Sequence, residues 1–82
     1  MKVLKFYADW CTPCKQLSKV FESVADLGAE VVGIDIDEDY VVPTRYSIRG
    51  VPTCVVVDAE GKELRRKVGM MSETDLRSFI TG

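Results

Sequence analysis

Two cysteines separated by two residues, in the segment Trp10-Cys11-Thr12-Pro13-Cys14, constrain the fold more than any other feature of this chain. The six residues before Asp9 are apolar and partly aromatic, and they predict a β-strand over 3–8. The residues after the pair carry apolar side chains at helical spacing: Leu17, Val20, Phe21, Val24 and Leu27. A Cys-x-x-Cys between a strand and a helix is typical of a redox site, and the same pair could also bind a metal ion.

The rest of the chain predicts an α/β fold in the order βαβαββα. Gly28 is expected to end the first helix, and a second strand should run parallel to the first through a right-handed crossover. A short helical segment after Asp37-Glu38-Asp39 is expected to be interrupted at Pro43, and Ser72 is expected to cap the last helix. The later strands are predicted over 31–36, 53–57 and 63–68.

Length and composition narrow the class of protein. With 82 residues, the chain is expected to form one domain, 1–82. The net charge of -2 argues against a nucleic-acid or anionic-membrane surface, and no apolar run reaches the length of a membrane span. No signal peptide is recognised, so we expect a cytoplasmic protein, in which a spaced cysteine pair is more often catalytic or metal-binding than structural. The absence of histidine excludes His-based catalysis and Cys/His metal sites.

The position of the pair suggests a different role for each cysteine. Pro13 suits a first helical turn, so Cys11 would lie where backbone N–H groups are unpaired and favour a thiolate. Thiolate is the nucleophile in disulfide exchange. Cys14, one turn further into the helix, would be the resolving thiol.

Three segments together resemble the thioredoxin family. Residues 8–15 are similar to the family's active-site stretch, 46–53 to its second motif, which ends in a cis-proline, and 67–69 to its third, where a glycine loop borders the substrate groove. The resemblance implies a dithiol that reduces protein disulfides and is recharged by a flavin-dependent reductase, without a cofactor or metal of its own. It also implies a cis Val51-Pro52 bond. We expect a monomer.

The same resemblance implies a set of site residues around the catalytic Cys11 and Cys14. Pro13 and Lys5 would support the pair. The substrate chain would lie along a surface made by Trp10, Thr12, Gly50, Val51, Pro52, Thr53, Gly69 and Met70. Cys54 lies on an apolar strand, and we interpret it as a small hydrophobic core residue.

The chain departs from the family pattern in several places. It begins at what would be the family's second strand, so the first strand and helix have no counterpart and a four-stranded mixed sheet flanked by helices is expected, in the spatial order second, first, third, fourth. Lys19 stands where the family has a helix proline, and Thr12 where glycine is commoner. Lys5 stands where the family carries a buried aspartate that is thought to help deprotonate the resolving thiol.

Two interpretations of Lys5 remain open. If neutral, Lys5 could accept the proton of Cys14, and if charged, it could stabilise the Cys14 thiolate. Alternatively, its side chain reaches the surface or pairs with Asp35, without a role in the chemistry.

Three other functions are compatible with parts of the sequence. A glutaredoxin-like carrier would use glutathione, although no Cys-Pro-Tyr-Cys is present. A dimer could combine two Cys11/Cys14 pairs into a four-cysteine metal or cluster site. A structural subunit of a larger enzyme would not need its thiols.

Overall fold

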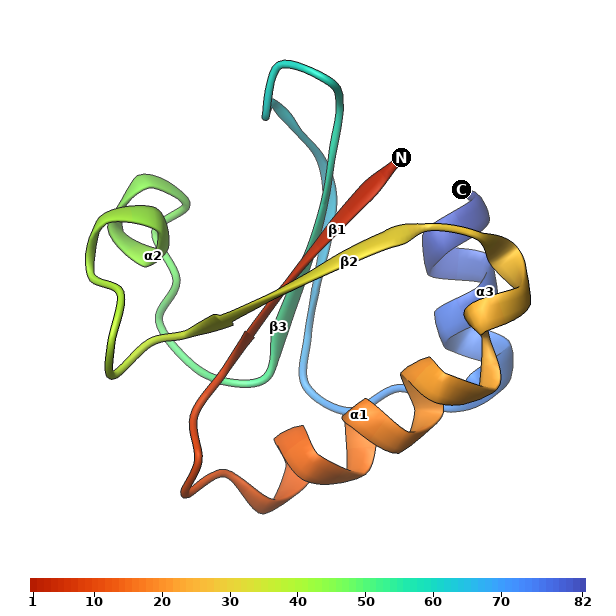
Figure 1. Cartoon of the computed structure of the whole chain (residues 1–82), viewed down its shortest axis with the longest axis horizontal. Helices are drawn as coiled ribbons and strands as arrows, with labels where there is room; N and C mark the ends of the chain where they lie inside the picture. The colour runs from red at the N-terminus through yellow and green to blue at the C-terminus, as the bar shows by residue number, and fades with distance from the viewer.

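A four-stranded mixed sheet forms the centre of the molecule in the computed structural model, which describes residues 1–82 (Figure 1). The strands lie in the order β2-β1-β3-β4, as predicted. β1 is parallel to β2 and antiparallel to β3, and β3 is antiparallel to β4. Their bounds are Lys2–Tyr7, Glu30–Asp35, Thr53–Val57 and Glu63–Val68. β1 and β2 thus each begin and end one residue earlier than predicted.

The two faces of the sheet are covered unequally. On one face, α1 (Thr12–Ser23) and α3 (Glu73–Thr81) pack on Val3 and Val56 through Leu17 and Leu76. On the other, the short helix α2 (Val41–Arg45) covers a second cluster that includes Phe6. Figure 1 shows α1 and α3 together on one side and α2 on the other. None of the helices combines the length and the apolar composition that a membrane span requires.

The first helix is shorter than predicted. α1 ends at Ser23, and a separate 3-10 helix, η1, spans Ala25–Leu27 before Gly28, which has φ +69°. The carbonyl of Ser23, which a continuous helix would pair with the Leu27 N–H, accepts a hydrogen bond from Arg77 at 3.1 Å. The Leu27 N–H instead reaches Val24 O, so the chain tightens into a 3-10 turn.

The expected interruption at Pro43 does not occur. Pro43 lies inside α2, in its first turn, where a helix does not need the N–H that proline lacks. The acidic segment before it is not helical. Instead, the Asp39 carboxylate accepts hydrogen bonds from the Val41 and Val42 N–H groups, at 2.9 and 3.2 Å, and so starts the helix.

The ends of α3 are both held by hydrogen bonds. The Ser72 hydroxyl accepts the Asp75 N–H at 3.1 Å, as predicted for a helix cap. At the other end, Arg65 of the edge strand β4 donates to the carbonyls of Phe79 and Ile80, at 2.6 and 2.9 Å. β4 therefore fixes the last turn of α3 against the sheet.

Candidate active site

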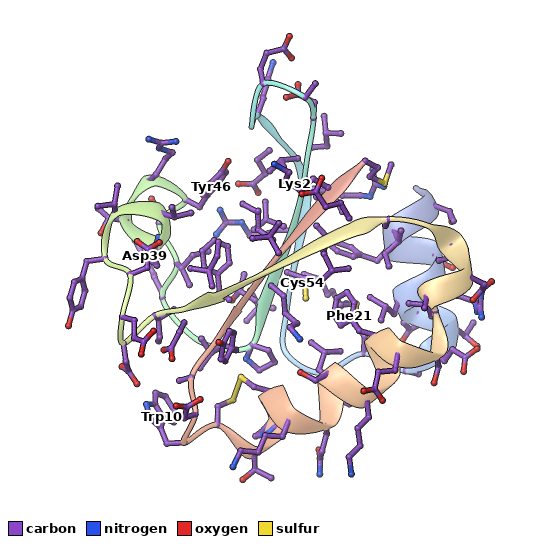
Figure 2. All side chains as sticks on the ribbon, in the orientation of Figure 1. Lys2, Trp10, Phe21, Asp39, Tyr46 and Cys54 are labelled. Carbon is purple, nitrogen blue, oxygen red and sulfur yellow. A yellow bond between two sulfur atoms is a disulfide. The ribbon has the colours of Figure 1, made fainter.

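The cysteine pair lies where β1 passes into α1. The Cys11 N–H donates to Ala8 O at 3.1 Å, which turns the chain sharply after the strand. Cys11 is the N-cap residue of α1, and its Sγ accepts the Cys14 N–H at 3.2 Å. The two residues are joined in a disulfide, with their Cα atoms 5.2 Å apart, visible as a yellow bond in Figure 2. Thr12 and Pro13 between them are exposed on the first helical turn.

Both cysteines are largely shielded in this oxidised form. Cys11 is 4% exposed and Cys14 is 3% exposed. They form a small cluster with Ala8, and Tyr7, Ile36 and Val51 pack against it. The two sulfurs therefore differ by their place on the helix, at its cap and inside its first turn, and not by overall exposure.

The second predicted segment, 46–53, approaches the pair through Val51 near its end. The Val51-Pro52 peptide bond is cis, as expected. The Thr53 hydroxyl donates to Gly50 O at 2.7 Å, which closes the loop. Thr53 is 2% exposed, so its side chain holds the loop from below and is not itself open to a substrate.

The third segment reaches the same loop. The Gly69 N–H donates to Pro52 O at 2.8 Å, and Gly69 has φ +95°, a conformation that glycine adopts without strain. Met70, the next residue, is 43% exposed, whereas Met71 is buried in the core. The structure thus brings Gly50, Pro52 and Gly69 together.

Trp10 is the most exposed aromatic ring beside the pair. The residue is 68% exposed, and its indole Nε1 donates to the Asp37 carboxylate at 3.0 Å. Figure 2 shows Trp10 at the same end of the molecule as the disulfide bond. The hydrogen bond fixes one edge of the ring while the rest remains open to solvent.

Lys5 lies on the face of the sheet that α1 covers. Its Nζ donates to the Ser18 hydroxyl at 2.8 Å, and that hydroxyl donates to Cys14 O at 3.1 Å. Burial lowers the pKa of Lys5. Two neighbours act in the opposite direction: Glu22, and Cys54, which is the residue of β3 that pairs with Lys5. Lys5 forms no ion pair with Asp35, so the predicted pairing with Asp35 is wrong, whereas the alternative in which the half-buried side chain reaches the surface stays a prediction.

The largest hollow in the molecule is not at the cysteine pair. It has a volume of about 520 Å³ and lies mainly between α2 and the sheet, along Leu4, Val32 and Val42. A smaller hollow of about 150 Å³ borders Cys14, Asp9 and Ser18. The chemistry of a disulfide pair needs a sulfur accessible from outside, not an enclosed pocket for a small molecule.

Comparison with known proteins identifies the family. The thioredoxin family model matches residues 1–82. The chain belongs to the thioredoxin family. It is 38% identical over 81 residues to a thioredoxin of Acidithiobacillus ferridurans, covering 95% of this chain and 74% of that protein. It is 34% identical over 80 residues to a thioredoxin of Mycoplasmoides gallisepticum, covering 95% and 79%.

Solved thioredoxin structures have the same fold. A thioredoxin variant from Halobacterium salinarum superposes with a TM-score of 0.86 at 40% identity, covering 96% of this chain and 70% of that one. The Fasciola hepatica thioredoxin superposes with a TM-score of 0.85 at 34% identity, covering 98% and 77%.

As a thioredoxin-family protein with an intact Cys11–Cys14 pair, the chain is a thiol–disulfide oxidoreductase. Membership of the thioredoxin family implies protein disulfides as substrates and a reductase as partner. It favours exchange chemistry over the glutaredoxin-like and metal-binding alternatives.

Two contacts of this thioredoxin site were not found in the sequence analysis. Ser18 bridges Lys5 and Cys14 O, and Asp37 binds the Trp10 indole. Ser18 lies four residues after Cys14, a spacing at which a hydroxyl commonly bonds back to the helix carbonyl, so this contact had a local signal. Asp37 is 27 residues from Trp10, and only the parallel pairing of β1 and β2 brings their ends together.

Proposed function

We propose that residues 1–82 act as one domain that reduces disulfides in other proteins, with Cys11 as the attacking thiol and Cys14 as the resolving thiol. The Cys11 thiolate attacks one sulfur of the substrate disulfide, and the other sulfur leaves as a thiolate that takes a proton from water. Cys14 then loses its proton and attacks Cys11 Sγ. The Cys11–Cys14 disulfide forms, the second substrate thiolate leaves, and two electrons have passed to the substrate.

The observation that carries these roles is the hydrogen bond from the Cys14 N–H to Cys11 Sγ at the start of α1. An N–H at a helix start stabilises a negative charge on the sulfur that accepts it, and the helix dipole acts in the same direction. Cys14 lies inside the first turn, so its sulfur is not at the helix cap. This asymmetry supports Cys11 as the nucleophile.

The substrate would lie across a shallow surface around Cys11. Exposed Trp10 and Met70 offer apolar contact, and Thr12 and Gly50 are also exposed. Val51, which packs against the cysteine cluster, would contact the substrate chain from the side. Pro52 and Gly69 shape the loop through their mutual hydrogen bond, and Pro13 begins the helix.

The partners follow from the same chemistry. Oxidised protein must be reduced before the next cycle, and we assign this step to a flavin-dependent reductase. The protein would work as a monomer, since a substrate must reach Cys11 from outside, and in a reducing compartment such as the cytoplasm.

The roles of the two cysteines are tested with Cys11→Ser and Cys14→Ser in an insulin-reduction assay with dithiothreitol as donor. Cys11→Ser should lose all activity above the donor alone. Cys14→Ser, reduced and then freed of dithiothreitol before it meets insulin, should accumulate a mixed disulfide at Cys11, seen by mass spectrometry, because no second thiol is present to resolve it. Cys54→Ala is the matched control and should keep its activity. A mixed disulfide at Cys14 in the Cys11→Ser variant, with activity retained, would reverse the assignment.

The partner is tested by comparing electron donors. NADPH with a thioredoxin reductase should support insulin reduction, and glutathione with its reductase should support little. Turnover with glutathione alone would favour the glutaredoxin-like function instead.

A further inference from the structure

A chain of two hydrogen bonds links Lys5 to the peptide of the resolving cysteine. Lys5 Nζ donates to Ser18 Oγ at 2.8 Å, and Ser18 Oγ donates to Cys14 O at 3.1 Å. Because the hydroxyl proton of Ser18 is directed to Cys14 O, its oxygen lone pairs face Lys5 and can only accept. The geometry therefore requires Lys5 as the donor, and it holds Nζ two hydrogen bonds from Cys14.

Two opposing effects act on the ammonium group of Lys5, and burial, which lowers its pKa, is the larger. Glu22 of α1 faces it and favours the positive charge, whereas Cys54 of β3 faces it as a neutral thiol, because burial raises the pKa of Cys54 to about 12. From β2, the paired residue is Gly33, which has no side chain. The Phe21 ring lies with its centroid 5.3 Å from Nζ, close enough for a cation–π contact. No positively charged side chain is placed against Lys5 by these contacts.

Space for water lies on both sides of Ser18. A hollow of about 400 Å³ runs along Lys5, Ser18 and Glu22. The separate hollow of about 150 Å³ borders Ser18 and Cys14. Water fits in either, so a proton lost by the Cys14 thiol has a route to solvent without passing to Lys5.

We infer that Lys5 and Ser18 form a positioning pair for the resolving step, in which Ser18 holds the positive charge of Lys5 behind Cys14 and so favours loss of the Cys14 thiol proton. The Cys14 thiolate then attacks Cys11 Sγ, the bond from Cys11 to the substrate sulfur breaks, and the substrate leaves as a thiolate. Lys5 keeps its proton throughout. This inference rests on the roles proposed for Cys11 and Cys14.

The two steps can be followed separately with an aromatic disulfide that releases a coloured thiolate. Reduced protein mixed with an excess of this reagent should release one equivalent when Cys11 attacks, at a rate that rises with reagent concentration. A second equivalent should follow when Cys14 attacks Cys11, at a rate independent of concentration. Lys5→Met should slow the second phase about tenfold at neutral pH and move its pH dependence about one pH unit higher, with the first phase unchanged.

Matched variants separate charge from packing. Lys5→Arg keeps a cation and should keep the wild-type pH dependence. Lys19→Met removes an exposed lysine of α1, next to Ser18 in the sequence, and should change nothing. Ser18→Ala should slow the second phase in the same direction as Lys5→Met. The double variant Lys5→Met/Ser18→Ala should be no slower than Lys5→Met alone, since the two residues act as one unit.

The results that overturn the inference differ from those that overturn the function. A second phase with the same rate and pH dependence in Lys5→Met, or additive effects of the two substitutions, would remove the role of the pair. If Lys5→Arg slowed the second phase as much as Lys5→Met does, the cause would be packing and not charge. If the wild type released no second equivalent, the Cys11/Cys14 cycle itself would fail. Ser18→Ala and Lys5→Arg keep the test valid if Lys5→Met does not fold.

Discussion

Cys54 shows what happens to a thiol of this chain without a helix start beside it. It lies on β3 with no exposed surface, and burial raises the pKa of its thiol to about 12, although the charge of Lys5 acts in the opposite direction. Cys11 instead caps α1 and accepts an N–H. The same residue type is therefore reactive in one place and inert in the other, as the sequence analysis expected for Cys54.

This difference predicts selective alkylation. In reduced native protein at neutral pH, iodoacetamide should modify Cys11 first and leave Cys54 unmodified, because the Cys54 thiolate is scarce and out of reach. Peptide mapping by mass spectrometry gives the order. In denaturant all three cysteines should react, which is the internal control. If Cys54 in the native protein were labelled as fast as Cys11, its thiol could not be buried in the core.

Whether the role of a residue could be predicted depended on how far apart in the sequence its contacts lie. Cys11, Cys14 and Pro52 are marked by short contiguous motifs, so they could be placed from the sequence. The role of Asp37 depends on two strand ends meeting, which no local pattern records. The contact of Lys5 with Ser18 could not be predicted. The alternation of residues along a strand predicts which face of the sheet a side chain lies on, but not which helix side chain it meets there.

Arg77 connects three elements at the end of the molecule away from the cysteine pair. From α3, it binds the Asp26 carboxylate of η1 through two hydrogen bonds of 3.0 Å, Ser23 O at the end of α1, and Glu73 of its own helix. This network explains why the helical pattern that runs to Leu27 breaks at Ser23. Apolar spacing predicts where a helix packs, but its last turn is decided by partners from elsewhere in the chain.

Arg77→Gln should lower Tm by a few degrees at neutral pH, since several charged hydrogen bonds are lost together. The Arg77 guanidinium holds the pKa of Asp26 below its ordinary value of 3.8, so this stabilisation is present above that pH and is lost as pH falls through the lowered pKa. The difference in Tm between wild type and variant should therefore shrink in acid. Arg45→Gln, an exposed arginine of α2, is the control and should leave Tm nearly unchanged. A difference independent of pH would exclude the ion pair as its cause.

The whole molecule depends on a small core, in which α1 and α3 share one face of the sheet. Leu76 of α3 is fully buried in the same cluster as Leu17 and Val56. A domain of this size is only marginally stable, with an unfolding free energy of roughly 5–15 kcal/mol. The strand order was predicted with the resemblance to the thioredoxin family, and the parallel pairing of β1 with β2 follows from the βαβ unit. Which helices share a face was not predicted, because it depends on contacts between elements that are distant in the sequence.

Leu76→Ala should therefore cost about 2–5 kcal/mol in the free energy of unfolding, a large part of the total. Denaturant titration of the reduced protein measures this loss. Val41→Ala, at a position that is 70% exposed, should cost much less. Equal losses for the two variants would mean that the α1–α3 layer is not the main core.

The disulfide joins two residues of one helical turn, with Cα atoms 5.2 Å apart, so its opening needs no movement of β1, α1 or the loop at Pro52. We therefore expect the oxidised and reduced forms to present nearly the same outline to another protein. A reductase and a substrate would then distinguish the two forms by the state of the sulfurs, because the disulfide can be attacked by a thiolate and reduced Cys11 can itself attack. Turnover would then need the two exchanges of S–S bonds but no rearrangement of the backbone, so a partner could leave as soon as its own bond to Cys11 is broken.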